Sequence, residues 1–395
     1  MNPIEETIKK NGGVIFAEPA IVHRVAYSGR NIVGPNDSFT APLMDGRGYL
    51  PVEWWVMSIT QAENDARVDG EGVSNLVLAD GSTMRLDHAA RESETLLFGP
   101  YRSRWPLTKI LDIGGKPVKT SFSSEPEVPP IPCHLHSGVP VNGVANIASG
   151  KLEAYFLPPV DVAPYEQDFG RVKTRLGVKP STSRGAFLNG MRKFGIDDEL
   201  YALLNEFEVR PFDGWIIPPG VVHAPGPWTT FEIQLPQDDF NLLAWRLGQR
   251  IPANELASQR EAQLLRGLGS EEEVLEKLVA WDATARPDFE QAYRRPSRII
   301  EEGAWGAKRQ IFFDQFYGES LEVKPGMSYA VTGDKPVAAV LWSGHGTVNG
   351  LALDHGNGRE REFLITPNAR ATVANAGPSN LMLFLVHPLT IDRKY

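Results

Sequence analysis

Most of the chain alternates short apolar runs with clusters of Gly, Pro, Asn and Asp. Runs of about four to eight residues bounded in this way are typical of strands in a β-sandwich or barrel. The pattern therefore predicts a mainly β protein. The clearest expected strands are VEWWVMSIT (52–60), LEAYFLPP (152–159), WIIPPG (215–220), TTFEIQLP (229–236), PVAAVLWSG (336–344) and LMLFLVHP (381–388).

Two segments follow a helical period instead. In residues 186–207, apolar residues recur at helical spacing, and Asp197 or Asp198 is a natural helix cap. In residues 253–295, Ser270 and the acids that follow it predict a helix start. We therefore expect a β-rich domain over 1–250, a helical segment over 251–297 and a second β domain over 298–395.

The two β regions contain a similar sequence pattern. WIIPPGVVHAPG (215–226) and FLITPNARATVANAG (363–377) both read as a strand, a turn and a second strand. This rhythm is typical of jelly rolls. We interpret the chain as a bicupin, which is a protein of two jelly-roll β-barrels.

Composition narrows the function classes. The 395 residues carry a net charge of -9, which disfavours a nucleic-acid partner but not an anionic small molecule. Cys133 is the single cysteine, so no internal disulfide forms. The N-terminus lacks the apolar core of a signal peptide, and no run of 18 apolar residues occurs. We expect a cytoplasmic protein without a membrane contact, as a monomer or homodimer.

His134 and His136 are two residues apart, so on a strand both rings point to one face. Such a pair is either two metal ligands or two surface or hydrogen-bonded histidines. Glu153 shares a strand face with Lys151, and that face either joins the histidines or meets water. Pro218-Pro219-Gly220 then leads to His223.

Three histidines and one carboxylate make a suitable ligand set for one divalent metal ion. The sequence therefore predicts a metal site of His134, His136, Glu153 and His223. Zn²⁺ is the expected ion, and Fe²⁺, Mn²⁺, Ni²⁺ or Co²⁺ are alternatives. His345 and His355 lack a matching carboxylate in the sequence, so we expect the C-terminal domain to be metal-free.

Several segments resemble, in order, those of the short, bacterial-type (type I) mannose-6-phosphate isomerases, a cupin family. The matching segments are VEWWVMSITQAENDARV (52–68), RWPLTKILD (104–112), GKLEAYFL (150–157), YALLNEFEVRPFDGWIIPPGVVHA (201–224) and TTFEIQLPQDD (229–239). The resemblance implies a zinc-dependent isomerase of carbohydrate metabolism. It would interconvert an aldose and a ketose, as a sugar or sugar phosphate, through a metal-stabilised enediolate.

The same chemistry needs a group that shuttles a proton between two carbons. Glu232 and Gln234 share a strand face, and we expect Glu232 and Lys151 to be catalytic; a solvent-facing Glu232 is the alternative. We expect Gln234, Lys109, Arg246 and Trp228 to bind substrate. Lys109 could instead only support its strand, and Trp228 could be core.

The chain departs from the family pattern at three points. His134 stands where the family has Gln, the family Arg after the EIQ strand is missing with Arg246 nearby, and residues 122–132 look inserted. The third histidine leaves open a non-haem iron cupin oxygenase. A non-catalytic, sugar-binding bicupin is the other alternative.

Overall fold

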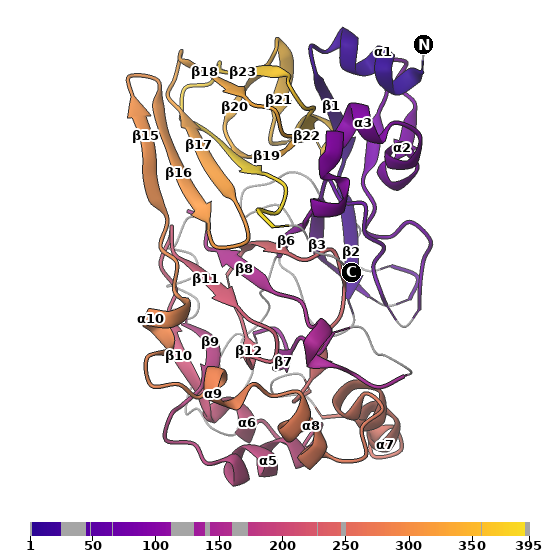
Figure 1. Ribbon diagram of the computed structural model, residues 1–395, viewed down its shortest axis with the longest axis vertical. Coiled ribbons are helices and arrows are strands. Elements are labelled where there is room, and N and C mark those ends of the chain that lie inside the picture. The colour runs from indigo at the N-terminus through magenta and orange to yellow at the C-terminus, as the bar shows by residue number, and fades with distance from the viewer. Residues whose placement is uncertain are drawn as a thin grey trace.

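The computed structural model describes most of the chain, and its strands form four antiparallel sheets (Figure 1). The C-terminal strands occupy one end of the molecule, and helices α5 to α9 occupy the other. The described residues are 2–24, 45–47, 49–64, 66–111, 130–138, 143–159, 173–226, 228–245, 250–356 and 358–391.

Two sheets form the half that contains the predicted metal ligands. The six-stranded sheet has the order β11-β8-β13-β6-β3-β2, with β2 (Ala20–Arg24), β3 (Leu50–Val56), β6 (Leu107–Leu111), β8 (Glu153–Phe156), β11 (Gly214–Ile217) and β13 (Thr230–Gln234). The five-stranded sheet has the order β10-β9-β12-β7-β14, with β7 (His134–Leu135), β9 (Lys173–Val178), β10 (Leu204–Glu208), β12 (His223–Ala224) and β14 (Asn241–Leu242).

The other half contains the C-terminal strands, and the predicted mainly β fold is confirmed. Its nine-stranded sheet has the order β15-β16-β17-β24-β19-β22-β1-β4-β5, with β1 (Val14–Glu18), β4 (Asn75–Val77), β5 (Thr83–Arg85), β15 (Arg298–Gly303), β16 (Gly306–Phe312), β17 (Gly318–Val323), β19 (Val337–Ser343), β22 (Glu362–Ile365) and β24 (Leu381–Val386). A four-stranded sheet of order β18-β23-β20-β21 contains β18 (Ser328–Thr332), β20 (His345–Val348), β21 (Leu351–Asp354) and β23 (Arg370–Asn375).

One sheet contains strands from both sides of the domain boundary predicted at residue 250. Strand β1 pairs antiparallel with β22, with Val14 opposite Ile365, and also pairs with β4. The N-terminal strands therefore complete the C-terminal sheet. The proposed division of the chain stays a prediction, but residues 14–18 and 75–85 belong by pairing with the last hundred residues.

Helices are short and lie mostly at the ends of the molecule. They are α1 (Pro3–Lys10), α2 (Leu86–Glu92), α3 (Glu94–Phe98), α5 (Arg184–Arg192), α6 (Glu199–Ala202), α7 (Leu256–Gln259), α8 (Glu271–Lys277), α9 (Trp281–Thr284) and α10 (Phe289–Tyr293), with the 3₁₀ helices η1 (Gly99–Arg104), η2 (Ile147–Ser149) and η4 (Gly358–Glu360) and the π-helix η3 (Arg260–Leu265). Among the described residues, none of the helices combines the length and apolarity that crossing a membrane requires.

The predicted helix start at Ser270 is confirmed, since its side chain accepts from the Glu273 N–H at 3.4 Å. The predicted helix over 186–207 is broken instead: α5 and α6 are separate, and β10 begins at Leu204. Asp197 accepts from the Glu199 N–H at 3.0 Å, so it starts α6 as a local turn.

The six-stranded sheet is buried on both faces, and alternation along β13 shows how it is used. Phe231 packs on Phe312 and Phe384 of the C-terminal half, with ring centroids 5.5 and 4.8 Å apart. Its neighbours Glu232 and Gln234 are also buried, but on the opposite face. One face of the sheet is therefore an apolar interface and the other carries polar groups.

A buried carboxylate joins the two halves. Glu362 of β22 accepts from the Trp54 indole N–H at 2.6 Å, from the Met57 backbone N–H at 2.5 Å and from the Ser74 hydroxyl at 3.0 Å. Burial raises the pKa of Glu362 to about 7, and these donors oppose the rise. The carboxylate therefore satisfies the Trp54 and Met57 N–H groups, for which the structure shows no other acceptor, whereas the Ser74 hydroxyl also lies 3.3 Å from the Trp55 carbonyl.

We predict that Glu362→Ala lowers the free energy of unfolding by about 3 kcal/mol or more, because it strands two buried N–H donors that cost about 1–3 kcal/mol each. Urea denaturation measures the change. Glu302→Ala, on an exposed position of β15, is the matched control and should stay within about 0.5 kcal/mol of the parent. Equal stability of the two variants would contradict this role for Glu362.

Candidate metal centre

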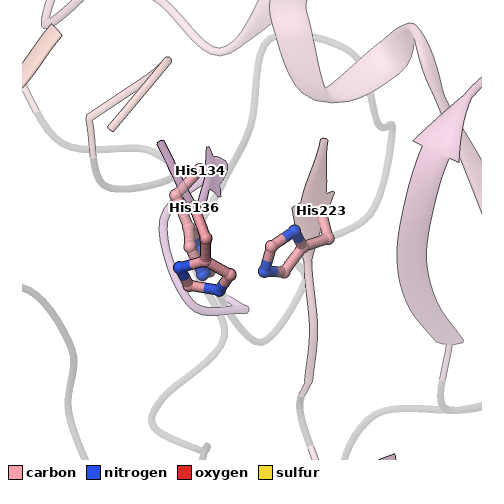
Figure 2. Close-up of side chains that lie close together, drawn as sticks. All are labelled: His134, His136 and His223. Carbon is pink, nitrogen blue, oxygen red and sulfur yellow. The ribbon is translucent and has the colours of Figure 1, made fainter. Parts of the chain in front are cut away.

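Three histidines converge inside the N-terminal half (Figure 2). His134 on β7 and His223 on β12 are a directly paired cross-strand couple, and His136 follows His134 by two residues. One nitrogen from each ring lies within 4.8 Å of the others, and all three side chains are buried. The tight Pro218-Pro219-Gly220 turn, where Gly220 has φ of 75°, precedes β12.

Glu153 reaches the same point from the facing sheet. Its Oε2 atom lies 2.8 Å from Nε2 of His136, and its Oε1 atom lies 3.1 Å from Nε2 of His223. The four predicted ligands therefore come together, with three from the five-stranded side and one from the six-stranded sheet.

Backbone carbonyls fix the proton on each ring. Nδ1 of His134 lies 2.7 Å from the carbonyl oxygen of Pro132, and Nδ1 of His136 lies 2.8 Å from that of Asp239. Nδ1 of His223 lies 2.8 Å from the carbonyl oxygen of Val221. A carbonyl oxygen only accepts, so each Nδ1 carries the hydrogen and each Nε2 presents a lone pair.

The convergent atoms are consequently all acceptors. Nε2 of His136 and Nε2 of His223 are buried and have no hydrogen-bond partner among the described residues. A cation satisfies such a set, and carbonyl-held imidazoles are the usual support of metal-ligating histidines. The residues present therefore fit a bound divalent ion.

The charge states agree with this role. Burial lowers the pKa of His136 to about 4, and burial together with the other two histidines holds the pKa of His134 well below its ordinary value. Burial opposes ionisation of Glu153, but the Lys151 charge beside it favours the carboxylate, and the pKa of Glu153 lies well below the usual range. Neutral imidazoles and a carboxylate anion are the forms that bind metal.

Two neighbours hold Glu153 in place. The Tyr155 hydroxyl donates to Glu153 Oε1. The Lys151 ammonium lies 3.4 Å from Glu153 Oε2 and donates to Gln234 Oε1 at 2.8 Å. Gln234 gives its own N–H groups to the carbonyls of Leu235 and Gln237, so here it positions Lys151.

Glu232 lies on β13, where it is directly opposite Lys109 of β6 on one side and Tyr155 of β8 on the other. It is buried, and its Oε1 atom has no hydrogen-bond partner among the described residues. Burial and the nearby Glu153 charge raise the pKa of Glu232 to about 8, against the opposing effect of Lys109 and Lys151. Among the described carboxyls that line the pocket, Glu232 is the one whose pKa is raised rather than lowered, which makes it a candidate proton carrier.

A buried ion network that the sequence did not reveal adjoins Glu232. Arg24 of β2 donates to Glu53 at 2.8 Å and to Asp238 at 2.9 Å, and Lys109 lies 3.5 and 3.7 Å from the same two carboxylates. Alternation along β3 puts Glu53 and Trp55 on one face, but nothing in the spacing connects residues 24 and 238. These contacts hold the pKa of Glu53 and of Asp238 low, although burial opposes this.

Most of these groups line one pocket of about 420 Å³ of empty volume, part of which is open solvent. Leu111, Ile131, Phe240 and Leu242 form its apolar wall. The described lining residues are Arg24, Glu53, Lys109, Leu111, Ile131, His134, His136, Lys151, Glu153, Tyr155, Glu232, Asp238, Phe240 and Leu242. A pocket lined mainly by charged and polar groups suits a small polar molecule.

The four residues predicted to bind substrate differ in their position relative to the pocket. Lys109 lines the pocket, whereas Gln234 lies behind Lys151. Trp228 is buried, donates to the Pro158 carbonyl at 3.2 Å and is not among the described lining residues. Arg246 lies outside the described residues.

Comparison with known proteins gives the fold. No protein-family model and no curated protein matches the chain. Mannose 6-phosphate isomerase from Bacillus subtilis is 14% identical with a TM-score of 0.61, over 95% of this chain and 99% of that one. A protein from Archaeoglobus fulgidus assigned as a mannosephosphate isomerase is also 14% identical, with a TM-score of 0.59 over 96% and 98%.

A third structure, a mannose 6-phosphate isomerase bound with zinc and yttrium, is 10% identical with a TM-score of 0.52 over 95% and 99%. At these identities the likeness establishes a shared fold across nearly the whole length. The architecture that the sequence resemblance implied is thus confirmed.

We predict that Glu153→Ala abolishes stoichiometric metal binding and leaves the fold intact, because the only anionic ligand is lost from a site of three neutral imidazoles. Elemental analysis of the purified variant measures this, with circular dichroism as the check on folding. Glu206→Ala, at a partly exposed position on β10 of the five-stranded sheet, is the control variant and should keep its metal. An unchanged metal content in Glu153→Ala would refute the ligand set.

Proposed function

We propose that this chain, which shares the fold of mannose-6-phosphate isomerases, is a metal-dependent aldose–ketose isomerase acting on a sugar or sugar phosphate. The observation that carries the proposal is the pairing of two features in one pocket. A ligand set suited to a divalent ion lies beside Glu232, a buried carboxyl with a pKa near 8.

Interconversion of an aldose and a ketose moves one proton between C1 and C2 and another between O1 and O2. A divalent ion held by the four ligands would supply Lewis-acid polarisation of the substrate carbonyl. Glu232 takes the proton from one carbon and returns it to the other. A pKa close to the working pH suits a group that must act first as base and then as acid.

The neighbouring cations have distinct tasks. Lys151 is fixed between Glu153 and Gln234 and presents positive charge to the enediolate oxygens of the substrate. Lys109 neighbours Glu232 across the sheet and limits how far burial raises its pKa. Lys109 thereby keeps Glu232 within reach of ionisation.

The choice between a sugar and its phosphate rests on charge. The cations among the described lining residues are Arg24, Lys109 and Lys151, and each already contacts a carboxylate. A phosphate would compete with these buried pairs. Arg246 stays a prediction for substrate binding, and a substrate panel must include both free and phosphorylated sugars.

The test is deuterium exchange at C1 and C2 in deuterated water, with zinc-loaded protein and a panel of aldoses, ketoses and their 6-phosphates. We predict exchange with at least one member. Glu232→Gln should reduce that exchange by about 100-fold or more, because it removes the proton carrier but not a ligand. Glu206→Gln is the control, and metal content should be equal in all three proteins.

Exchange at the parental rate in Glu232→Gln would contradict the role of Glu232. Zinc-loaded protein without exchange on any sugar would contradict the isomerase proposal itself.

The pH dependence has a defined sign. Because Glu232 acts as a base only when ionised, kcat/KM should rise with pH on the acid side and level off above the pKa of Glu232. That pKa is about 8 without a metal ion, and a bound cation lowers it, so the inflection should fall below pH 8. A steady-state pH profile measures it, and an inflection that persists in Glu232→Gln would assign it to another group.

A second candidate is a non-haem iron oxygenase, because His134 makes the ligand set three histidines and one carboxylate. Iron in the purified protein and oxygen uptake without C1–C2 exchange would favour it. The isomerase is the stronger candidate since Glu232, Lys109 and Lys151 supply acid–base groups.

A further inference from the structure

A second group of potential metal ligands lies on the C-terminal half, in the four-stranded sheet. His345 starts β20 and Asp354 ends β21, and the two residues are directly opposite each other in the antiparallel pair. Nδ1 of His345 lies 3.1 Å from a carboxylate oxygen of Asp354. The next residue, His355, brings its ring to 4.8 Å from that of His345, measured between centroids.

The hairpin that carries these residues has a fixed register. Its two turn residues, Asn349 and Gly350, have φ of 49° and 81°, as a two-residue turn of type I′ requires. Such a turn leaves no freedom to slide β20 against β21. The backbone therefore holds His345 opposite Asp354 before any ligand binds.

The third ring is oriented by the backbone. Nδ1 of His355 lies 3.2 Å from the carbonyl oxygen of Gly344, so this nitrogen carries the hydrogen and Nε2 presents a lone pair. His134, His136 and His223 in the buried centre are held in the same way. A carbonyl-held imidazole beside a carboxylate and a second imidazole is the arrangement that metal sites use.

We propose that His345, Asp354 and His355 bind one divalent transition-metal ion, of the Zn²⁺ class, at a site open to water. One ligand atom from each residue lies within 4.8 Å of the others. An ion with bonds of about 2.0–2.2 Å needs these atoms roughly 3.4 Å apart. The side chains are 51%, 44% and 30% exposed, and binding requires them to rotate from their present positions to that spacing.

The ligand chemistry selects the ion. Two imidazoles and one carboxylate favour Zn²⁺, Ni²⁺ or Cu²⁺ over Mg²⁺ and Ca²⁺, which prefer oxygen ligands. Water fills the remaining positions, so the ion exchanges readily. The sequence did not show this site because the carboxylate that His345 lacks nearby is supplied by Asp354 across the hairpin.

A third cluster shows why proximity alone is insufficient. His23, Asp45 and Glu71 also lie close together. There the Arg47 guanidinium donates to Asp45 at 2.7 Å and to Glu71 at 2.6 Å, so a cation already neutralises both carboxylates. Among the described contacts of Asp354, the ionisable partners are the two histidines, which metal can replace.

The test is calorimetric titration of metal-free, full-length protein with Zn²⁺. We expect two equivalents, a tight one at the buried centre and a weaker one at the hairpin. His345→Ala and His355→Ala should each weaken the second equivalent by about tenfold or more, because each removes a ligand. The tight equivalent must persist in both variants and serves as the check on folding.

His88→Ala is the matched control. His88 is also 51% exposed and lies 3.9 Å from a carboxylate, that of Asp87, but it does not belong to a three-ligand group among the described residues. It should leave both equivalents unchanged. A parent protein that binds no second equivalent, or a second equivalent that survives in both His345→Ala and His355→Ala, would overturn the proposal.

Discussion

The structure depends on burying one charged face of the six-stranded sheet. Strands β2, β3, β6, β8 and β13 turn acidic and basic side chains toward the five-stranded sheet, and each buried charge needs a partner. Arg24 and Lys109 neutralise Glu53 and Asp238. The histidine and Glu153 cluster is different, because acceptors meet there and a divalent ion would satisfy them. Glu232 lies between the two, and burial together with the nearby Glu153 charge raises its pKa.

The opposite face of the same sheet explains why the two halves form one body. Phe231 packs on aromatic residues of the C-terminal half. Glu362 accepts hydrogen bonds across the interface from Trp54 and Met57. Polar and apolar residues alternate along β13, so this strand contributes both to the site and to the interface.

Local patterns in the sequence predicted the mainly β fold and singled out the residues that converge beside the pocket. His134 and His136 were assigned to one face from their spacing, and the turn before His223 was visible as Pro-Pro-Gly. The contacts of Arg24 with Asp238 join residues 214 positions apart, and the opposition of His345 and Asp354 depends on hairpin register. The pairing of β1 with β22 likewise follows from tertiary packing rather than from either segment. The binding role expected for Trp228 stays a prediction, and its burial agrees with the alternative that it is a core residue.

X-ray absorption at the metal edge of the purified protein, with the hairpin site removed by His345→Ala, tests the central claim most directly. The account predicts one ion per chain with three imidazole nitrogens and a carboxylate oxygen, at about 2.0–2.2 Å if the ion is zinc. A protein without bound metal, or an ion held by fewer than three histidines, would contradict it.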